Sequence, residues 1–167
     1  IAVTSDLPHK NAEGIIRAYE RYCSKTDKPL KLRIIGIADV AQYHLSQDVG
    51  NNIICYKYIE SNEEMHHMIA AAKIFLFLSL VEGFGFPPIE AMQLGTPVVC
   101  SGVSSLPEVV GGAAILVDPC EPDEVAEALV KLQNDENKQQ ELIAKGYHNI
   151  ERFSWDKTAN KYADIVM

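Results

Sequence analysis

A regular alternation between short apolar runs and stretches of helical periodicity constrains the fold of this chain more than any other feature. Six runs are predicted as strands: residues 1–3, 32–36, 52–56, 74–78, 97–100 and 114–117. Their residues are nearly all apolar, as in the strands of a parallel sheet that helices cover on both faces. This alternation predicts an α/β fold with a doubly wound, roughly six-stranded parallel sheet, similar to a Rossmann domain.

The stretches between the strands carry signals for the beginnings and ends of helices. Asn11 is a suitable N-cap, and Ser61 with Glu64 forms the pattern of a capping box. Pro88 suits a first helical turn, and Gly95 suits the end of the same helix. Helices are therefore predicted over residues 12–23, 39–48, 61–71, 88–94, 106–110, from 122, over 136–149 and after Ser154.

Length and charge exclude several classes of protein. A chain of 167 residues suits a single domain with a substantial core. The net charge of −8, with no cluster of Lys and Arg to offset it, argues against a nucleic-acid-binding surface. The longest apolar run, residues 74–81, is too short to span a bilayer, and no signal peptide is visible. The chain begins at Ile1 inside a predicted strand without an initiator Met, so we expect a fragment or an excised domain.

The cysteines form neither a metal-binding nor a disulfide pattern. The four cysteines are widely spaced, none belongs to a C-x-x-C motif, and no Cys/His pair has the spacing of zinc ligands. Reduced thiols are therefore expected, which places the protein in the cytoplasm, and no metal site is predicted.

The most informative motif is a glycine loop that two glutamates bracket. Glu82 and Glu90 stand eight positions apart around residues 83–89, which follow the apolar run 74–78 and lead into a predicted helix. Glycine lets backbone N–H groups approach an anion, and a helix N-terminus adds partial positive charge, so such a loop can bind phosphate. An ordinary tight turn explains the glycines alone equally well. The Glu90 carboxylate can also accept two hydrogen bonds from a vicinal diol such as ribose, and phosphate with diol indicates a nucleotide.

The segment that contains both glutamates also resembles a known motif. Residues 79–99 are similar to the paired-glutamate motif of family-4 retaining glycosyltransferases, which have the two-domain GT-B architecture. The similarity continues through residues 104–111 and 118–119, returns at residues 153–155, and is weaker at residues 10–11. The resemblance therefore covers nearly the whole chain.

The resemblance implies how the chain is organised. Residues 1–167 would form a single nucleotide-sugar-binding domain, the C-terminal half of a GT-B fold, and the N-terminal acceptor domain would be absent. Residues 153–167 would form a helix that crosses back toward that other domain. Phe153 and Trp155 are expected to be packing residues there.

The resemblance also implies roles for individual residues. Two are expected at the reacting centre: Glu82 would face the transferred sugar, and Lys10 would meet the diphosphate and stabilise its charge as it departs. Glu90 would bind the ribose hydroxyls. The residues expected to bind the donor are Gly83, Phe84, Gly85, Phe86, Glu90, Ser5 and Tyr58, with residues 104–108 as a loop that flanks the site.

Ser5 is a departure from the family pattern. Relatives often carry an arginine at this position, so half of the expected cationic clamp on the diphosphate is missing. Tyr58 follows the third predicted strand, where relatives place the nucleobase pocket.

The function that the resemblance implies is sugar transfer from a nucleoside-diphosphate sugar, with UDP favoured and GDP as the alternative. The acceptor would be a saccharide or a lipid-linked saccharide in polysaccharide or O-antigen synthesis. No cofactor is expected, and no Asp-x-Asp metal motif occurs. The acceptor would bind the other domain, which could also attach the cytoplasmic protein peripherally to the inner membrane, so this chain alone would be inactive. A nucleotide-sugar epimerase half and a non-catalytic nucleotide-binding module stay open as alternatives.

Overall fold

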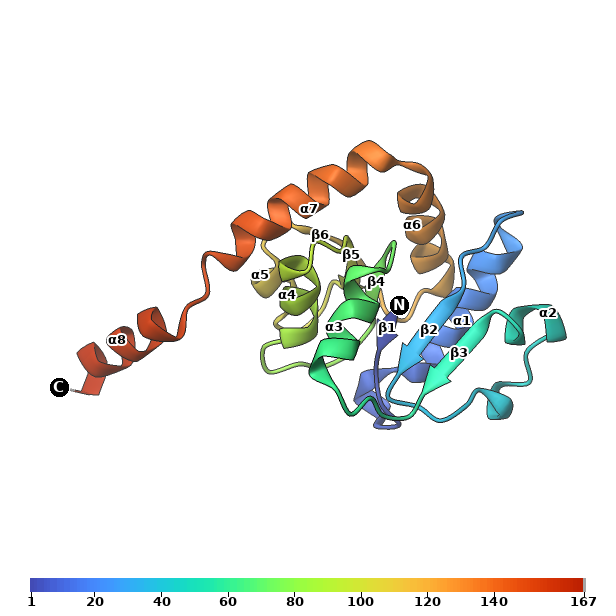
Figure 1. Cartoon of the computed structure of the whole chain (residues 1–167), viewed down its shortest axis with the longest axis horizontal. Helices are drawn as coiled ribbons and strands as arrows, with labels where there is room; N and C mark the ends of the chain where they lie inside the picture. The colour runs from blue at the N-terminus through green and yellow to red at the C-terminus, as the bar shows by residue number, and fades with distance from the viewer. Residues whose placement is uncertain (167) are drawn as a thin grey trace.

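The computed structural model describes residues 1–166, and its strands follow the predicted apolar runs. The strands are β1 (Ala2–Val3), β2 (Leu32–Ile35), β3 (Ile53–Tyr56), β4 (Phe75–Phe77), β5 (Val98–Ser101) and β6 (Ala114–Val117). They form one parallel sheet of six strands in the order β3-β2-β1-β4-β5-β6 (Figure 1). The predicted α/β fold with a doubly wound parallel sheet is therefore confirmed.

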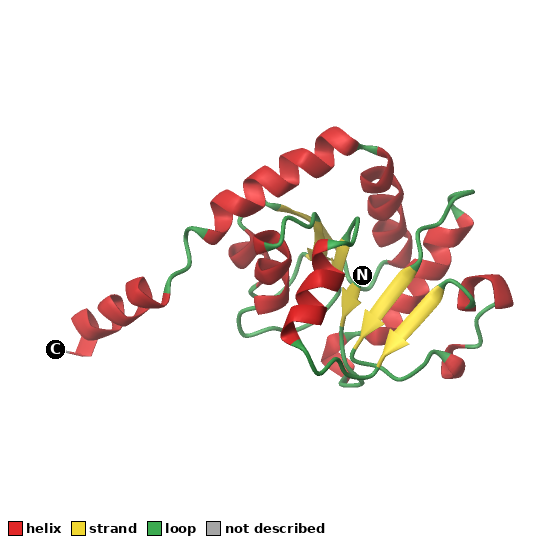
Figure 2. Cartoon of the chain, viewed as in Figure 1, coloured by secondary structure: helices red, strands yellow, loops and turns green. Residues whose placement is uncertain are grey.

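Helices connect the strands and lie on both sides of the sheet (Figure 2). They are α1 (Ala12–Ser24), α2 (Gln47–Gly50), α3 (Asn62–Ala70), α4 (Phe86–Gln93), α5 (Leu106–Val110), α6 (Pro122–Asn134), α7 (Glu136–Ile150) and α8 (Trp155–Val166), with short 3-10 helices at Pro8–Lys10 and Ala41–Tyr43. Within residues 1–166, no helix combines the length and the apolar character that crossing a bilayer requires.

Alternate residues of the strands supply two separate parts of the core. On β4, Leu76 packs in the cluster that includes α1 and α6, whereas Phe75 and Phe77 pack in the cluster that includes α3, α4 and α5. All three side chains are almost fully buried. Burial of a side chain of this size stabilises the fold by about 1.5–3 kcal/mol relative to exposure. The continuous apolar pattern of the strand is thus explained by contacts on both of its faces.

Two of the predicted helix caps are present in the structure. The Asn11 side-chain oxygen accepts a hydrogen bond from the Gly14 N–H at the start of α1 (3.1 Å). Ser61 Oγ accepts a hydrogen bond from the Glu64 N–H at the start of α3 (3.2 Å). Both bonds satisfy backbone donors that the start of a helix leaves without a partner.

The helix predicted over residues 39–48 is wrong. The structure instead has the 3-10 helix Ala41–Tyr43 and the short helix α2, with His44 between them at φ +50°. A residue in this left-handed conformation cannot continue a right-handed helix.

The C-terminal helix α8 extends away from the sheet and has no buried residue (Figure 1). Trp155 does not pack within residues 1–166, since its side chain is 79% exposed, and its packing against another domain stays a prediction. Phe153 does pack, because its ring lies edge-on against Phe84 with the ring centroids 5.2 Å apart. Of the segment expected to cross to another domain, only Met167 lies outside the described residues.

Candidate functional site

The candidate site lies where the strand order of the sheet reverses. β1 and β4 are neighbours, but the chain continues from β1 to β2 on one side and from β4 to β5 on the other. Their carboxyl ends place loop 4–11 beside loop 78–85, at the usual ligand position of doubly wound sheets. The Leu80 N–H and the Ser79 hydroxyl join the two loops, because both donate to the His9 carbonyl, at 2.7 and 3.0 Å.

The two residues predicted at the reacting centre contact each other. Lys10 Nζ lies 2.6 Å from Glu82 Oε1, although 72 positions separate the residues in the sequence. The Lys10 side chain is 27% exposed and the Glu82 side chain 12%, so the ion pair is partly shielded from water. Lys10 Nζ also lies 5.9 Å from the centroid of the Phe77 ring. Each charge compensates the other in this state, so any anion that bound here would have to compete with Glu82 for the Lys10 ammonium group.

Asn11 fixes the backbone next to Lys10. Its φ of +54° is left-handed, a conformation that asparagine tolerates better than most residues. Besides capping α1, its side-chain amide donates to the carbonyls of Leu78 (3.0 Å) and Pro119 (3.1 Å). It thereby ties the end of β1 to the residues that follow β4 and β6. The sequence predicted only the cap, because both carbonyl partners are brought there by the sheet.

The two glycines of the loop have different roles. Gly85 has a φ of +99°, and a Cβ there would lie 2.5 Å from Leu106 Cδ2, so the fold itself requires glycine. A Cβ on Gly83 would meet no atom within 4 Å. The packing of the protein therefore does not explain Gly83, and its open backbone leaves room for a ligand to approach.

The start of α4 offers an anion fewer donors than predicted. The helix begins at Phe86, two residues before the predicted Pro88, with Gly85 as its N-cap. Pro87 and Pro88 follow, and proline has no N–H. Of the four N–H groups at a helix start, those of Gly85 and Phe86 are left for an anion. Lys10 consequently has to balance more of the charge of any phosphate bound here.

Glu90 is the fifth residue of α4 and lies in its second turn, not in the first turn as predicted. Its side chain is half-buried and forms no hydrogen bond or ion pair with any other residue among 1–166. An unpaired carboxylate keeps its full capacity to accept hydrogen bonds from hydroxyl groups. This environment suits the predicted contact with ribose.

Ser5 and Tyr58 stand at the same edge of the sheet but lie outside the ion pair. Ser5 follows β1, and its hydroxyl accepts a long hydrogen bond from the Leu7 N–H (3.4 Å). Tyr58 follows β3, which is two strands away from β1 in the sheet, a separation of about 10 Å. Its side chain is 77% exposed. The structure thus brings Lys10 and Glu82 together and leaves Tyr58 apart from them.

Two serines that follow β5 hold loop 78–85, which contains Glu82 and is called the glutamate loop below. Ser104 Oγ accepts a hydrogen bond from the Glu82 N–H (3.1 Å) and donates one to the Glu82 carbonyl (2.9 Å). Ser105 Oγ lies 3.0 Å from the Glu82 carbonyl oxygen and 2.9 Å from that of Phe84. The sequence indicated a loop that flanks the site, but these contacts were missed, since their only signal is an adjacent pair of small hydroxyl residues.

Three phenylalanines cluster beside the glycine loop. The ring centroids of Phe84 and Phe86 are 4.8 Å apart, and those of Phe84 and Phe153 are 5.2 Å apart. Phe86 is 53% exposed, so part of the cluster faces solvent. The cluster links the loop to the segment that precedes α8 and leaves an aromatic surface open next to it.

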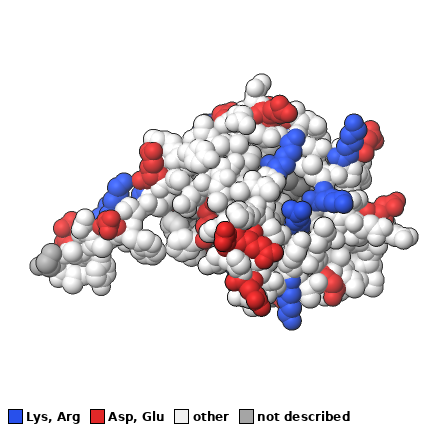
Figure 3. Space-filling view, in the orientation of Figure 1, with Lys and Arg blue, Asp and Glu red and all other residues white. Residues whose placement is uncertain are grey.

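The charges on the surface are mixed in sign. On the face shown in Figure 3, both Lys and Arg side chains and Asp and Glu side chains are present. Among residues 1–166, no three side chains of His, Cys, Asp or Glu gather closely enough to hold a metal ion.

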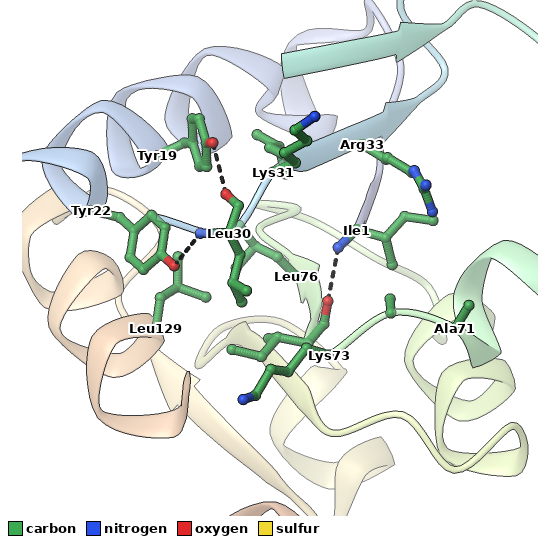
Figure 4. A pocket seen from close by; sticks show the side chains of 13 residues that line it. Ile1, Tyr19, Tyr22, Leu30, Lys31, Arg33, Ala71, Lys73, Leu76 and Leu129 are labelled. Atoms are coloured by element: carbon green, nitrogen blue, oxygen red, sulfur yellow. Dashed lines mark hydrogen bonds between the residues drawn. The ribbon is translucent and has the colours of Figure 1, made fainter. Parts of the chain in front are cut away.

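A separate cavity of about 260 Å³ lies at the opposite, amino edge of the sheet, beside Ile1 and Ile74 (Figure 4). The Tyr19 hydroxyl donates to the Leu30 carbonyl (2.8 Å), and the Tyr22 hydroxyl accepts from the Leu30 N–H (2.8 Å). These polar groups of the cavity already have partners. The cavity is also remote from the paired glutamates, so it is not part of the candidate site.

Comparison with known proteins places the chain in a family. The family model described as glycosyl transferases group 1 matches residues 1–149. O-antigen chain mannosyltransferase B of Escherichia coli is 33% identical over 163 residues, which are 93% of this chain and 43% of that protein. MMP alpha-(1->4)-mannosyltransferase of Mycolicibacterium hassiacum is 33% identical over 165 residues, which are 95% of this chain and 40% of that protein. The chain therefore spans less than half the length of these relatives.

Solved structures share the fold at lower identity. Sucrose-phosphate synthase of Thermosynechococcus elongatus matches with a TM-score of 0.79 and 22% identity, over 98% of this chain and 44% of its own. HepE of Anabaena, in complex with UDP, matches with a TM-score of 0.79 and 18% identity, over 99% of this chain and 47% of its own. Together with the family match over residues 1–149, these findings show that the chain belongs to the glycosyl transferases group 1, the family-4 retaining glycosyltransferases, as a C-terminal GT-B domain.

Proposed function

We propose that this domain binds the nucleoside-diphosphate sugar of a retaining glycosyltransferase at the carboxyl edge of β1 and β4. The observation that carries the proposal is the Lys10–Glu82 ion pair, which stands beside the open backbone of Gly83. The same edge presents the carboxylate of Glu90, which has no partner within residues 1–166. A cation, an accessible backbone and a carboxylate acceptor are what a diphosphate and a ribose require.

The proposed reaction breaks the bond between the anomeric carbon of the sugar and the diphosphate oxygen. The electron pair of that bond leaves with the nucleoside diphosphate, and the Lys10 ammonium group stabilises the resulting charge. The acceptor hydroxyl oxygen bonds to the anomeric carbon on the face that the leaving group vacates, and its proton passes to the departing diphosphate. Glu82 faces the transferred sugar. Positioning and electrostatics, not a protein base of this chain, provide the catalysis.

The proposed donor carries mannose on GDP. Both relatives named above are mannosyltransferases. These names give no support to the preference for UDP that the motif implied. The sequence left GDP as the alternative nucleotide. Because both relatives are named mannosyltransferases, we propose GDP in place of UDP.

The proposed acceptor is a saccharide or a lipid-linked saccharide bound by a second domain. The support is the name of O-antigen chain mannosyltransferase B, of which this chain covers only 43%. The protein would act in the cytoplasm, with attachment to the inner membrane through that second domain. The alternative of an epimerase half has no support in the relatives named above.

Titration with nucleoside diphosphates tests the proposed function. GDP is expected to bind and to raise Tm, with UDP and ADP weaker, because a ligand that binds the native state stabilises it. At a hundredfold excess over Kd the gain is about 2.7 kcal/mol, or roughly 5–10 °C in Tm for a domain of this size. Differential scanning calorimetry measures the shift. No binding of any of the three at millimolar concentration would overturn the proposal, and a larger shift with UDP would overturn only the choice of base.

Replacement of Glu90 tests the assigned ribose contact. Glu90→Ala is expected to weaken GDP binding by about 1.5–3 kcal/mol, the range for hydrogen bonds to a charged group. The wild type should bind 2′-deoxy-GDP more weakly than GDP, and the variant should not distinguish the two. Isothermal titration calorimetry measures all four affinities, with Glu136→Ala as the control at an exposed glutamate of α7, outside the candidate site. Equal affinity of the wild type for both nucleotides contradicts the contact.

A further inference from the structure

The glutamate loop has no regular secondary structure, so side-chain contacts have to set its position. The loop connects β4 to α4, and Ser104 reaches it from the loop between β5 and α5. Ser104 bonds to both backbone groups of Glu82, its N–H at 3.1 Å and its carbonyl at 2.9 Å. A reciprocal pair of this kind fixes the peptide groups on both sides of one residue.

The backbone of Ser104 has a conformation that glycine adopts more easily. Its φ is +59°, in the left-handed region that L side chains disfavour. If only the turn mattered, glycine would relieve the strain. What serine adds is the hydroxyl group, and this group uses its capacity both to donate and to accept. A residue with a strained backbone whose side chain forms hydrogen bonds with the glutamate loop points to a role in the site.

We propose that Ser104 is a positioning residue of the donor site, which fixes the backbone of Glu82 and thereby aims its carboxylate at Lys10. The geometry that depends on it is the 2.6 Å contact between Glu82 Oε1 and Lys10 Nζ. Ser105 supports the same segment through the carbonyls of Glu82 and Phe84. For its effect on nucleotide binding, this inference rests on the proposed function.

Loss of the Ser104 hydroxyl loosens the loop without unfolding the domain. Ser104 is exposed and belongs to neither core cluster. A loop that the ligand itself has to order binds that ligand more weakly, because the cost of ordering falls on binding. Ser104→Ala and Ser104→Gly are both expected to weaken GDP binding about tenfold, the effect of losing two ordinary hydrogen bonds, because the cost of ordering the loop outweighs the gain from a Lys10 ammonium group that Glu82 holds less closely.

Hydrogen exchange at the Glu82 amide, followed by NMR in the 167-residue chain, measures directly how well the contact with Ser104 protects this amide. This N–H donates to Ser104 Oγ, so both Ser104 variants are expected to speed its exchange about tenfold in the absence of nucleotide. Ser101→Ala is the matched control, because it removes a buried hydroxyl that has no hydrogen-bond partner within residues 1–166. The control should change neither the exchange rate nor the affinity for GDP.

Faster exchange together with weaker GDP binding in both Ser104 variants supports the inference. Unchanged exchange in Ser104→Gly overturns it, because the serine would then serve only the turn. Faster exchange with unchanged affinity also overturns it, because the hydroxyl would order the loop without positioning the site.

If the wild type binds no nucleoside diphosphate, the proposed function fails separately. The ¹⁵N shift of the Lys10 ammonium group then decides, since a shift in both Ser104 variants, but not in the control, supports positioning and no shift refutes it.

Discussion

Replacement of Lys10 by alanine is expected to weaken GDP binding by about 3–4 kcal/mol, a factor of roughly 100 to 1,000. Part of the loss, about 1.5–3 kcal/mol, is the charge-assisted hydrogen bond to the diphosphate. The rest comes from Glu82, whose carboxylate lies 2.6 Å from Lys10 Nζ and would then repel the diphosphate without compensation. The prolines at the start of α4 add to the effect, because they leave few backbone donors to take over.

Replacement of Glu82 by glutamine should change GDP binding in the opposite direction. The neutral side chain releases the Lys10 ammonium group and removes a negative charge beside the diphosphate, so affinity is expected to rise by about threefold to tenfold. The double variant Lys10→Ala/Glu82→Gln should lose less affinity than Lys10→Ala alone. The effect of the double variant minus the sum of the two single effects is the coupling energy between the two residues, which this double-mutant cycle measures.

Isothermal titration calorimetry of the single and double variants at two salt concentrations provides these values. Lys31→Ala is the matched control, since it removes the same charge from an exposed lysine at the opposite, amino edge of the sheet. A loss in Lys10→Ala no larger than in Lys31→Ala would show that Lys10 does not meet the diphosphate. Weaker binding in Glu82→Gln would show that Glu82 contributes to nucleotide binding instead of competing with it.

Most of the fold could be predicted from the sequence because strand and helix periodicity are local. The six apolar runs became the six strands, and the caps at Asn11 and Ser61 are where their side chains indicated. The helix predicted over residues 39–48 does not form, for a local reason that the sequence does not reveal: the backbone of His44 is left-handed. The exposure of Trp155 has a tertiary cause, since aromatic character indicates that a side chain packs but not on which surface.

The candidate site could be predicted only in part, because its geometry comes from the order of the strands. The motif suggested Lys10 and Glu82 separately, and only the adjacency of β1 and β4 puts their charges in contact. The same holds for Ser104, whose sequence neighbours give no sign that its hydroxyl reaches Glu82. Residues that act through other residues are thus the ones that sequence reasoning missed.

The exposed apolar side chains of α8 lead us to propose that another surface covers this helix in the functional protein. All are more than half exposed: Trp155 79%, Tyr162 68%, Ile165 83% and Val166 64%. Apolar side chains grouped on one element in this way mark a contact surface. The partner that we propose is the second domain of the GT-B architecture, toward which this segment is expected to cross.

The isolated chain is accordingly expected to transfer no sugar. We propose that the reaction takes place between two domains, and this chain supplies only Lys10 and Glu82 to the reacting centre. Without the second domain, one side of the sugar and diphosphate is open to water, which weakens every electrostatic contribution there. No second surface holds the acceptor hydroxyl near the anomeric carbon, and the loss of that positioning alone costs a factor of roughly a thousand or more in rate.

Release of GDP from GDP-mannose in the presence of a saccharide acceptor tests this expectation. The rate with the isolated chain should be at background, whereas a two-domain protein in which this domain is joined to the proposed acceptor domain should turn over. GDP binding by the isolated chain is the control, because it separates an inactive folded domain from an unfolded one. Comparable rates for the two proteins would show that the second domain is dispensable. The acceptor would then have to bind on this chain, and the exposed face of α8 would need another partner.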